Sequence, residues 1–305
     1  MKVLIFGATG FIGKNLVNKL LVDRHEVHII TRNKSKAEHI FPKTVIVHEH
    51  RFTDRQKLAT IINGKNAVIN LTGENLSAKI WNESFKQKIY NSRIETTKKI
   101  TEAIQSVRSK PEVFIQGSAI GYYGNNPLEE LTEYSPSGTG FLAKTVQDWE
   151  TESLPVYDLN VRLVIVRTGI VLSRAGGVFP LQLLPFRFFL GGHFGDGEQW
   201  ISWIHIDDQV RAIIHLLTHK FSLGIYNLTS PEPVLQKDYF KAIGATFHSP
   251  SWFHKPSKIL KTLLGEMAEE LILSGQRVMP HRLQNENFDF KFPTLITALS
   301  NLKNA

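Results

Sequence analysis

The sequence has no cysteine among its 305 residues. Disulfides and thiolate metal sites are therefore excluded, and a reducing compartment is compatible with the chain. Long apolar runs are also missing, because residues 178–190 contain Pro180, Pro185 and Arg187 and fall short of the roughly 20 residues that cross a bilayer. The apolar start of the chain is interrupted by three glycines and lacks a small-residue cleavage site. We expect a cytoplasmic protein without a membrane partner.

Concentrated charge is absent as well. Lys and Arg outnumber Asp and Glu by 36 to 28, which gives a net charge of +8, but the sequence contains no run of five basic residues. No basic stretch is interleaved with aromatic residues in the manner of a nucleic-acid binding surface. Dispersed positive charge fits a solvated surface that also accepts phosphorylated ligands. We therefore expect no nucleic-acid partner.

Two further catalytic patterns are lacking. No Gly-x-Ser-x-Gly elbow is present, so serine hydrolysis is unsupported. No H-x-x-x-H pair lies beside a glutamate, and we expect no metal site. His205, Asp207 and Asp208 include ligand types, but carboxylates at this point are typical of a helix start, where they satisfy free N–H groups.

Short β-branched runs alternate with longer helical patterns through the first two thirds of the chain. The expected strands are Lys2–Phe6, Glu26–Ile30, Val45–Val47, Ala67–Asn70, Val113–Gln116 and Val161–Val166. The expected helices between them are Phe11–Val22, Asp54–Asn63, Glu83–Val107 and Phe141–Ser153. Most of these strands are continuous apolar runs, as in strands covered on both faces. The pattern predicts an α/β protein with a Rossmann-type, doubly wound parallel sheet.

The pattern changes after Arg167. Residues 168–204 are rich in Gly, Pro and aromatics, and their length favours a functional loop region. A helix near Asp207–Thr218 and a strand near Gly224–Leu228 indicate a return to the first domain. The rest is mostly helical, with helix starts expected at Gln236, Pro256 and Pro293. We expect a dinucleotide-binding domain and a smaller, mostly helical substrate domain, which comprise residues 1–170 with about 205–230 and residues 171–204 with 231–305, respectively.

The strongest local signal is the glycine-rich segment that follows the first expected strand. Gly7 permits a tight turn, Gly10 lets the backbone approach a pyrophosphate, and Gly13 lets the helix pack closely on the strand. The first N–H groups of the helix then face the phosphates. The residues expected to bind a dinucleotide here are Gly7, Thr9, Gly10, Phe11, Ile12 and Gly13.

Arg32 follows the second expected strand, 19 residues after Gly13. An acidic residue at this place grips the ribose 2′-hydroxyl of NAD, whereas an arginine accommodates the 2′-phosphate of NADP. A charged hydrogen bond of this kind contributes about 1.5–3 kcal/mol. We therefore predict NADP(H) as the cofactor, bound at least about tenfold more tightly than NADH.

Motifs distributed over the whole chain point to a known family. They are GATGFIG (7–13), NLTGE (70–74), GSAIGYYG (117–124), AKTVQDWE (143–150), RTGIVLSRAGG (167–177), WIHIDD (203–208) and LLGEMAEELILSGQRVMPHRL (263–283). With them the sequence resembles an atypical extended short-chain dehydrogenase/reductase of the NAD(P)-dependent epimerase/dehydratase superfamily. It is most similar to the YfcH-like branch of epimerase family proteins, whose C-terminal domain has no assigned function.

The resemblance implies further contacts to the cofactor. Residues 71–73 would border the adenosine and phosphate side, Lys144 would hold the nicotinamide ribose hydroxyls, and residues 167–171 would pass beside the nicotinamide. The cofactor contacts implied in this way are Leu71, Thr72, Gly73, Lys144, Arg167 and Gly169. Relatives also form a homodimer through helices that correspond to residues 83–107 and 141–153, so a homodimer is expected by analogy alone.

The catalytic signature of the superfamily, Tyr-x-x-x-Lys, is incomplete, because Gly140 stands four residues before Lys144. A positioned acid or base contributes about 10²–10⁴-fold to rate, so the missing tyrosine must be replaced or the redox step is impaired. Ser118 resembles the hydroxyl residue that polarises a substrate carbonyl. Tyr122 is the favoured substitute donor, which makes Ser118, Tyr122 and Lys144 the candidate catalytic residues.

Two other residues are weaker candidates for replacing the tyrosine. Tyr123 precedes Gly124 as a structural tyrosine does in relatives. Glu74 follows the fourth expected strand, where a structural capping role is equally compatible with its position.

A second departure concerns the substrate. Nucleotide-sugar enzymes of the superfamily carry an arginine four residues before the position of His205, and here that residue is Ile201, flanked by Trp200 and Trp203. We interpret the pocket as apolar and aromatic, and expect a small substrate that is not a nucleotide sugar. Arg93 offers an anion contact near the cofactor, although an ion pair explains it equally well.

The sequence leaves two functions open. The first is an NADP-dependent oxidoreductase or epimerase-like enzyme that acts on a small carbonyl or alcohol. The second is a noncatalytic NADP(H)-binding protein that senses redox state and regulates a partner. The loss of the tyrosine at position 140 and of the arginine at position 201 favours the second, because both changes remove chemistry and leave cofactor binding intact.

Overall fold

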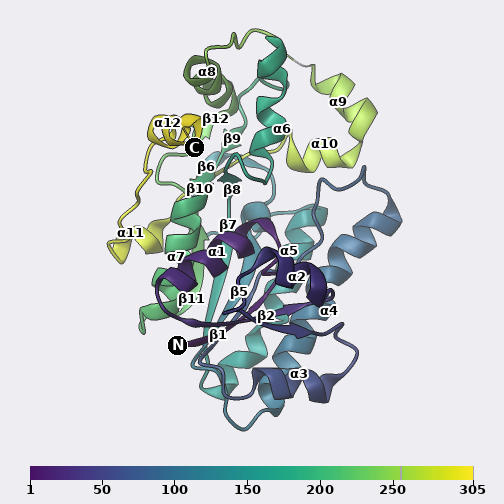
Figure 1. Cartoon of the computed structure of the whole chain (residues 1–305). Helices are drawn as coiled ribbons and strands as arrows, with labels where there is room; N and C mark the ends of the chain where they lie inside the picture. The colour runs from purple at the N-terminus through teal and green to yellow at the C-terminus, as the bar shows by residue number, and fades with distance from the viewer. Residues whose placement is uncertain (255, 305) are drawn as a thin grey trace.

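The computed structural model describes residues 1–254 and 256–304. Seven parallel strands form the central sheet in the lower part of the molecule (Figure 1). From one edge to the other they are β3 (Ile46–Glu49), β2 (Glu26–Thr31), β1 (Lys2–Phe6), β4 (Ala67–Asn70), β5 (Val113–Ala119), β7 (Arg162–Thr168) and β11 (Gly224–Leu228). Val3 of β1 pairs with Val27 on one side and Ala67 on the other. The strand order therefore reverses between β1 and β4, which is where open α/β sheets bind ligands.

Helices cover both faces of this sheet. They are α1 (Phe11–Val22), α2 (Lys34–Ile40), α3 (Arg55–Ile62), α4 (Glu83–Ser106), α5 (Phe141–Thr151) and α7 (Ile206–Thr218). Successive residues of a strand point to opposite faces, so Val3 and Ile5 of β1 pack in the core with α1 and α7, whereas Leu4 and Phe6 pack in the core with α3 and α4. All four side chains are fully buried. The uninterrupted apolar strands predicted from the sequence are explained by this double cover.

A smaller, largely helical region lies above the sheet in Figure 1. Its helices are α6 (Phe179–Leu183), α8 (Gln236–Phe247), α9 (Ser257–Leu264), α10 (Glu266–Leu271), α11 (His281–Asn285) and α12 (Leu295–Asn304). Its short strands form three pairs, which are β8 (Ile170–Leu172) with β10 (Trp203–His205), β9 (Trp200–Ile201) with β12 (Val234–Leu235), and β6 (Asn126–Leu131) with β13 (Gln276–Val278). The described residues also contain three 3₁₀ turns, of which η2 packs on α4 and β7 of the sheet region. They are η1 (Ile120–Tyr123), η2 (Leu154–Leu159) and η3 (Pro185–Phe188).

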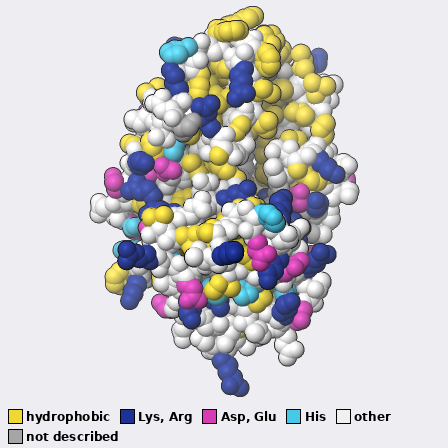
Figure 2. Space-filling model, viewed as in Figure 1, with side chains coloured by type: hydrophobic (Ala, Val, Ile, Leu, Met, Phe, Trp, Pro, Cys, Tyr) yellow, Lys and Arg dark blue, Asp and Glu magenta, His cyan; other side chains and the backbone are white. Residues whose placement is uncertain are grey.

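The upper region has an apolar core of its own. Trp203 and Tyr239 are completely buried there, and the inner faces of α6, α8 and α12 surround them. Several large apolar side chains remain exposed on the segments around this core, and Figure 2 shows hydrophobic side chains gathered at the top of the molecule. On the face drawn, Lys and Arg side chains are distributed over the rest of the surface.

The doubly wound parallel fold with a helical C-terminal region is confirmed. Strands β1, β4 and β11 and helix α1 have the bounds expected from the sequence, and α8 starts at Gln236 as predicted. The helices expected to start at Pro256 and Pro293 begin slightly later, at Ser257 and Leu295. Among the described residues, no helix is both long and apolar enough to span a bilayer. The proposed division into two domains and the cellular compartment stay predictions.

Candidate functional site

The turn between β1 and α1 accepts only glycine at two of its positions. Gly7 has a φ of +79°, and a Cβ there would lie 2.6 Å from the carbonyl oxygen of Leu71. A Cβ on Gly13 would lie 2.4 Å from the carbonyl oxygen of Gly7 and 2.7 Å from Cα of Ala8. These separations are too short for any side chain, so the strand, the turn and the helix approach each other as the glycine motif predicts.

The N-terminus of α1 is left free of side-chain caps. Its N-cap residue is Gly10, whereas Asn33, Asp54 and Asn82 each cap the following helix with a side-chain oxygen. A Cβ on Gly10 would meet only the carbonyl oxygen of Gly7 within 4 Å, at 3.1 Å, so the turn is open on its outer side. Uncapped N–H groups at the positive end of a helix bind phosphate groups well.

Arg32 lies directly after β2, the strand next to β1. Its side chain is exposed and makes no hydrogen bond or ion pair within residues 1–254 and 256–304. Neighbouring parallel strands end at the same edge of a sheet, so this guanidinium lies on the side of the glycine turn where a ribose phosphate would extend. The geometry agrees with the role predicted for Arg32, which stays a prediction.

Arg93 of α4 provides a second cation near the turn. A Cβ on Gly73 would lie 3.1 Å from its guanidinium. The guanidinium donates to the carbonyl oxygens of Ile89 (3.0 Å) and Glu74 (3.1 Å) and lies 5.2 Å from the centre of the Trp149 ring. Burial lowers the pKa of Arg93 to about 10, and the nearby charge of Glu74 offsets only part of this effect.

An anion at Gly73 would therefore be stabilised by a cation that has no carboxylate within ion-pair distance in the described part of the chain. The ion pair that the sequence also allowed for Arg93 is therefore not formed within the described residues. Thr72, which precedes Gly73, is held by Asn70, whose side-chain oxygen accepts from both the backbone N–H (3.1 Å) and the hydroxyl (2.5 Å) of Thr72.

A buried polar network lies behind the carboxyl ends of β5 and β7. Arg167 is 1% exposed, and its guanidinium forms two hydrogen bonds of 2.8 Å with the carboxylate of Glu150 on α5. Ser118 donates to the same carboxylate at 2.5 Å. Burial acts to lower the pKa of Arg167, but the bonds and charge of Glu150 outweigh it and raise the pKa above its usual value. Arg167 therefore stays positively charged, and its guanidinium is already paired with the carboxylate of Glu150.

Tyr123 completes this network. Its hydroxyl accepts from Arg167 (3.0 Å) and lies within hydrogen-bonding distance of the backbone oxygen of Thr132 (2.9 Å) and the side-chain oxygen of Asn227 (2.8 Å). Burial raises the pKa of Tyr123 to about 12, although the contacts with Arg167 act in the opposite direction. These partners and this burial agree with the structural role predicted for Tyr123, which stays a prediction.

The three predicted catalytic residues are only partly brought together. Ser118 donates to Glu150, the partner of Arg167, and the Tyr122 ring centre lies 3.3 Å from the guanidinium carbon of Arg167. The Tyr122 hydroxyl makes no hydrogen bond with the residues that the structure describes, and its side chain is partly exposed. Lys144 points away, because its side chain is 71% exposed and pairs with Asp148 at 2.6 Å. Glu74, the other candidate substitute for the tyrosine, forms an ion pair with Lys88 (3.1 Å).

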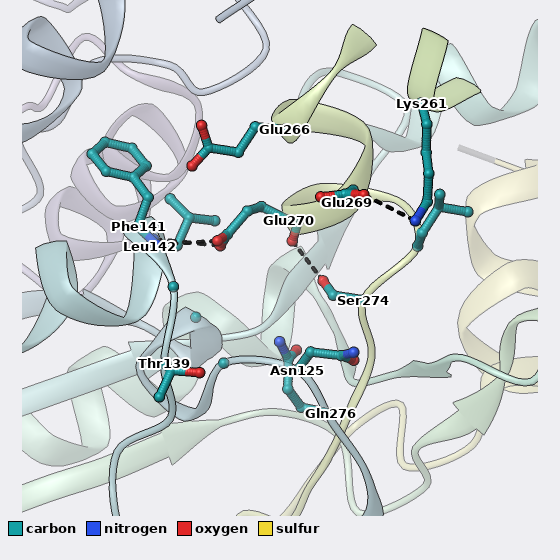
Figure 3. A pocket seen from close by; sticks show the side chains of 14 residues that line it. Asn125, Thr139, Phe141, Leu142, Lys261, Glu266, Glu269, Glu270, Ser274 and Gln276 are labelled. Carbon is teal, nitrogen blue, oxygen red and sulfur yellow. Dashed lines mark hydrogen bonds and ion pairs between the residues drawn. The ribbon is translucent and has the colours of Figure 1, made fainter. Parts of the chain in front are cut away.

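A carboxylate from the C-terminal region occupies the place next to Gly140. Gly140 has a φ of +106°, and a Cβ there would lie 2.5 Å from Oε1 of Glu270 on α10. The same carboxylate accepts from the first two backbone N–H groups of α5, those of Phe141 (3.1 Å) and Leu142 (3.4 Å), as Figure 3 shows. The missing tyrosine therefore coincides with the docking of α10 on the N-terminus of α5.

Glu270 also lines a cavity of about 610 Å³ between α5, α9 and α10. Glu266, Glu269, Lys261 and Gln276 lie around it, and Lys261 pairs with Glu269 at 2.9 Å (Figure 3). Charged and polar side chains share the lining of this cavity with Phe141, Leu142 and Leu273, so its wall is about equally polar and apolar.

The apolar, aromatic pocket that we expected from residues 200–203 is not found in this cavity. Ile201 and Trp203 do not line it, because they are buried in the core of the upper region. Trp200 lies 5.1 Å from the guanidinium of Arg277. Ile201 and Trp203 therefore serve packing, and the apolar, aromatic substrate pocket stays a prediction.

Sequence reasoning missed the two carboxylates that define this region. Glu150 ends a motif that was recognised but given no role, and its only sequence signal is an acidic residue on the apolar side of α5. Glu270 lies 130 residues after Gly140, and no local pattern connects the two.

Comparisons with known proteins agree with this geometry. The profile of the NAD dependent epimerase/dehydratase family matches residues 3–229, and that of a domain of unknown function, DUF1731, matches residues 256–302. The chloroplastic epimerase family protein SDR39U1 homolog of Arabidopsis thaliana is 38% identical over 98% of this chain and 86% of its own length.

Two solved structures are also similar. The crystal structure of human epimerase family protein SDR39U1 with NADPH has a TM-score of 0.89 at 31% identity and covers all of both chains. A nucleoside-diphosphate sugar epimerase from Corynebacterium glutamicum has a TM-score of 0.78 at 31% identity and covers 98% of this chain and 57% of that one. The chain belongs to the NAD dependent epimerase/dehydratase family.

Proposed function

We propose that the protein is an NADP(H)-dependent oxidoreductase or epimerase-like enzyme of the extended short-chain type. The observation that carries the proposal is the uncapped, open glycine turn at the point of strand reversal. Arg32, which has no ion-pair partner in the described part of the chain, follows the neighbouring strand. A 31% identical human relative was solved with NADPH, which supports the same choice of cofactor. Arg93 supplies a further cation at Gly73, on the phosphate side of the turn.

The cofactor, when bound, would supply or accept the hydride, and the chain would handle the substrate oxygen. Tyr122 is the proposed proton donor and acceptor, because its hydroxyl has no partner among residues 1–254 and 256–304 and its ring rests on a fixed cation. Ser118 holds its hydroxyl on Glu150, so we propose that it polarises a carbonyl only when that bond rearranges. Lys144 would reach the ribose hydroxyls after it leaves Asp148.

The substrate is proposed to be a small carbonyl or alcohol compound with polar groups. The 610 Å³ cavity supports this class, because charged and polar side chains such as Glu270 lie beside apolar ones on its wall. A nucleotide sugar stays disfavoured, because Ile201, at the place of the arginine that clasps a diphosphate in relatives, is buried in the core. One relative at 31% identity is nevertheless described as a nucleoside-diphosphate sugar epimerase, so nucleotide sugars belong in any substrate screen.

The second candidate function is a noncatalytic NADP(H)-binding protein that reports redox state to a partner. It is favoured by one specific observation, the Glu270 carboxylate that fills the space beside Gly140 where the catalytic tyrosine would stand. The chain then lacks the tyrosine that usually donates the proton, whereas the glycine turn that would bind the cofactor is unchanged.

Cofactor titration tests the binding of NADP(H), which both candidate functions require. We expect the wild type to bind NADPH at least about tenfold more tightly than NADH, and Arg32→Ala to remove this preference. Arg108→Ala is the matched control, since Arg108 is also exposed but lies on the loop before β5, at the other end of the strands. Equal affinity of the wild type for the two nucleotides would remove Arg32 from the proposed role.

Hydride transfer separates the two candidates. The bound NADPH is offered a panel of small aldehydes, ketones and nucleotide sugars, and its oxidation is followed by absorbance. An enzyme shows turnover that falls about 10²-fold or more in Tyr122→Phe. Oxidation of NADPH at the same rate in the variant and the wild type would refute the role of Tyr122. The absence of turnover with every compound, together with partner capture in only one redox state, would favour the sensor.

A further inference from the structure

A cluster of two histidines and one glutamate lies far from the glycine turn. His215 and His219 are four residues apart at the end of α7, and their rings stack with centres 5.2 Å apart. Glu286 follows α11 and faces both, since its Oε2 lies 3.0 Å from Nε2 of His215 and 3.6 Å from Nδ1 of His219. One ligand atom from each of the three residues lies within 4.8 Å of the others.

We propose that His215, His219 and Glu286 form a binding site for a divalent cation of the zinc type. Two imidazoles and one carboxylate are a common zinc ligand set, with bonds of about 2.0–2.2 Å. Tetrahedral bonds of that length place ligand atoms roughly 3.3 Å apart. The separations of Glu286 Oε2 from the two imidazole nitrogens, 3.0 and 3.6 Å, bracket this value, and all three ligand atoms lie within 4.8 Å of one another. The ion would replace the hydrogen bond that joins Nδ1 of His219 to the hydroxyl of Ser222 (2.9 Å).

The residues around Glu286 hold its carboxylate in an ionised, oriented state. The hydroxyl of Tyr226 donates to Oε1, and the hydroxyl of Ser222 donates to Oε2 at 2.7 Å. Arg282 in turn donates to the Tyr226 hydroxyl at 3.0 Å. Burial acts to raise the pKa of Glu286, but these hydrogen bonds together with the one from His215 lower it overall. Such outer partners are typical of metal sites, where they fix the orientation of the ligands.

The site is open on one side. The side chains of His215, His219 and Glu286 are 26%, 42% and 18% exposed, so a water molecule can fill the fourth ligand position. Pairs of charges in such partly exposed positions contribute little to stability by themselves. A bound cation would tie the same three residues together far more strongly.

The position of the cluster indicates what the cation does. Ser222 lies just before β11, so the cluster is at the amino end of the sheet, whereas the glycine turn is at the carboxyl end. The histidines belong to a helix that covers the sheet, and Glu286 belongs to the C-terminal region, where α11 packs on β11 (Figure 1). The cation would therefore fasten the C-terminal region to helix α7, and it would take no part in hydride chemistry.

The sequence does contain the helical pair, as His-Leu-Leu-Thr-His at 215–219. Our expectation of no metal rested on the absence of a glutamate beside such a pair. The glutamate comes 67 residues after His219 and reaches the histidines only through the fold.

Metal titration of the full chain tests the proposal. The protein is stripped with EDTA, and Zn²⁺ binding is measured by competition with a chelating dye and by metal analysis after gel filtration. We expect one Zn²⁺ per wild-type chain and at least about 100-fold weaker binding in His219→Ala. His281→Ala is the control, because His281 is an exposed histidine on α11 outside the cluster. Co²⁺ should give the visible absorption of a four-coordinate site in the wild type and the control only.

Thermal unfolding provides a second readout. Zn²⁺ at about 100 times its dissociation constant should raise the Tm of the wild type by roughly 4 °C or more, and should leave His219→Ala unchanged. Equal Zn²⁺ affinity in the wild type and His219→Ala, or an equal loss in His281→Ala, would overturn the proposal and leave a hydrogen-bonded ion pair. NADPH binding should be unaffected in every variant, so this result is independent of the proposed function.

Discussion

Restoring a side chain at position 140 should damage the protein rather than repair its catalytic signature. Gly140→Ala places a Cβ 2.5 Å from Glu270 Oε1, at a φ of +106°. The backbone strain costs about 1–2 kcal/mol for a residue other than glycine. The contact also displaces Glu270 from the two N–H groups that it caps, and loss of a cap costs about 0.5–2 kcal/mol. We expect Gly140→Ala to lower the free energy of unfolding by about 1.5–4 kcal/mol, and Gly140→Tyr by at least as much.

Gly64→Ala separates the two contributions. Gly64 has a φ of +75°, and a Cβ there meets no atom within 4 Å, so this variant measures backbone strain alone. Urea unfolding followed by tryptophan fluorescence gives the free energies, and Glu270→Ala completes a double-mutant cycle with Gly140→Ala. In the Glu270→Ala background, the effect of Gly140→Ala should fall to that of Gly64→Ala. The reasoning is refuted if the two glycine variants are equally destabilised, or if Glu270→Ala leaves the effect of Gly140→Ala unchanged.

Three further predictions concern substitutions at other positions. Gly13→Ala puts a Cβ 2.4 Å from the carbonyl oxygen of Gly7 and should weaken NADPH binding at least about tenfold, as measured by calorimetry. Glu150→Gln leaves the buried Arg167 without its countercharge and should destabilise the fold by about 3–5 kcal/mol in urea titrations. Burial, together with the charges of His28, Lys65 and Lys34, lowers the pKa of His48 to about 4. Its neutral form therefore favours the folded state, so stability falls as the pH drops from 6.5 toward 4, and His48→Asn should flatten that dependence.

The sequence was sufficient for the central sheet because its strands carry the signal locally. Each of β1, β4 and β11 is a short apolar run, and α1 begins at the last part of the glycine turn. Helix α2 was missed because only Ala37 of its seven residues is buried, which leaves no apolar stripe to detect. Strands β6 and β13 were missed for a different reason. They pair across about 150 residues and alternate too weakly to be recognised alone.

In the candidate site, too, the features encoded by a contiguous motif could be predicted, and those that depend on distant residues could not. Gly7, Gly10 and Gly13 act through backbone geometry within one turn, and the motif that encodes it is contiguous. Gly140 was recognised as a lost tyrosine, but the carboxylate of Glu270 that replaces it comes from the other region of the chain. A sequence motif can show that a catalytic group is missing, whereas the residue that takes its place is known only after the regions dock.

That docking also limits which group can act as the proton donor. Glu270 accepts hydrogen bonds from two backbone N–H groups, so its oxygens are engaged as acceptors and are poorly placed to give a proton. Tyr123 is fixed by three partners, and burial raises its pKa to about 12. Tyr122 has the same type of hydroxyl, lies beside the same guanidinium and is partly open to solvent. If the protein moves a proton during hydride transfer, Tyr122 is therefore the residue of η1 that can do so. Turnover of the wild type decides between an enzyme and a sensor, and the comparison with Tyr122→Phe then tests the role of this hydroxyl.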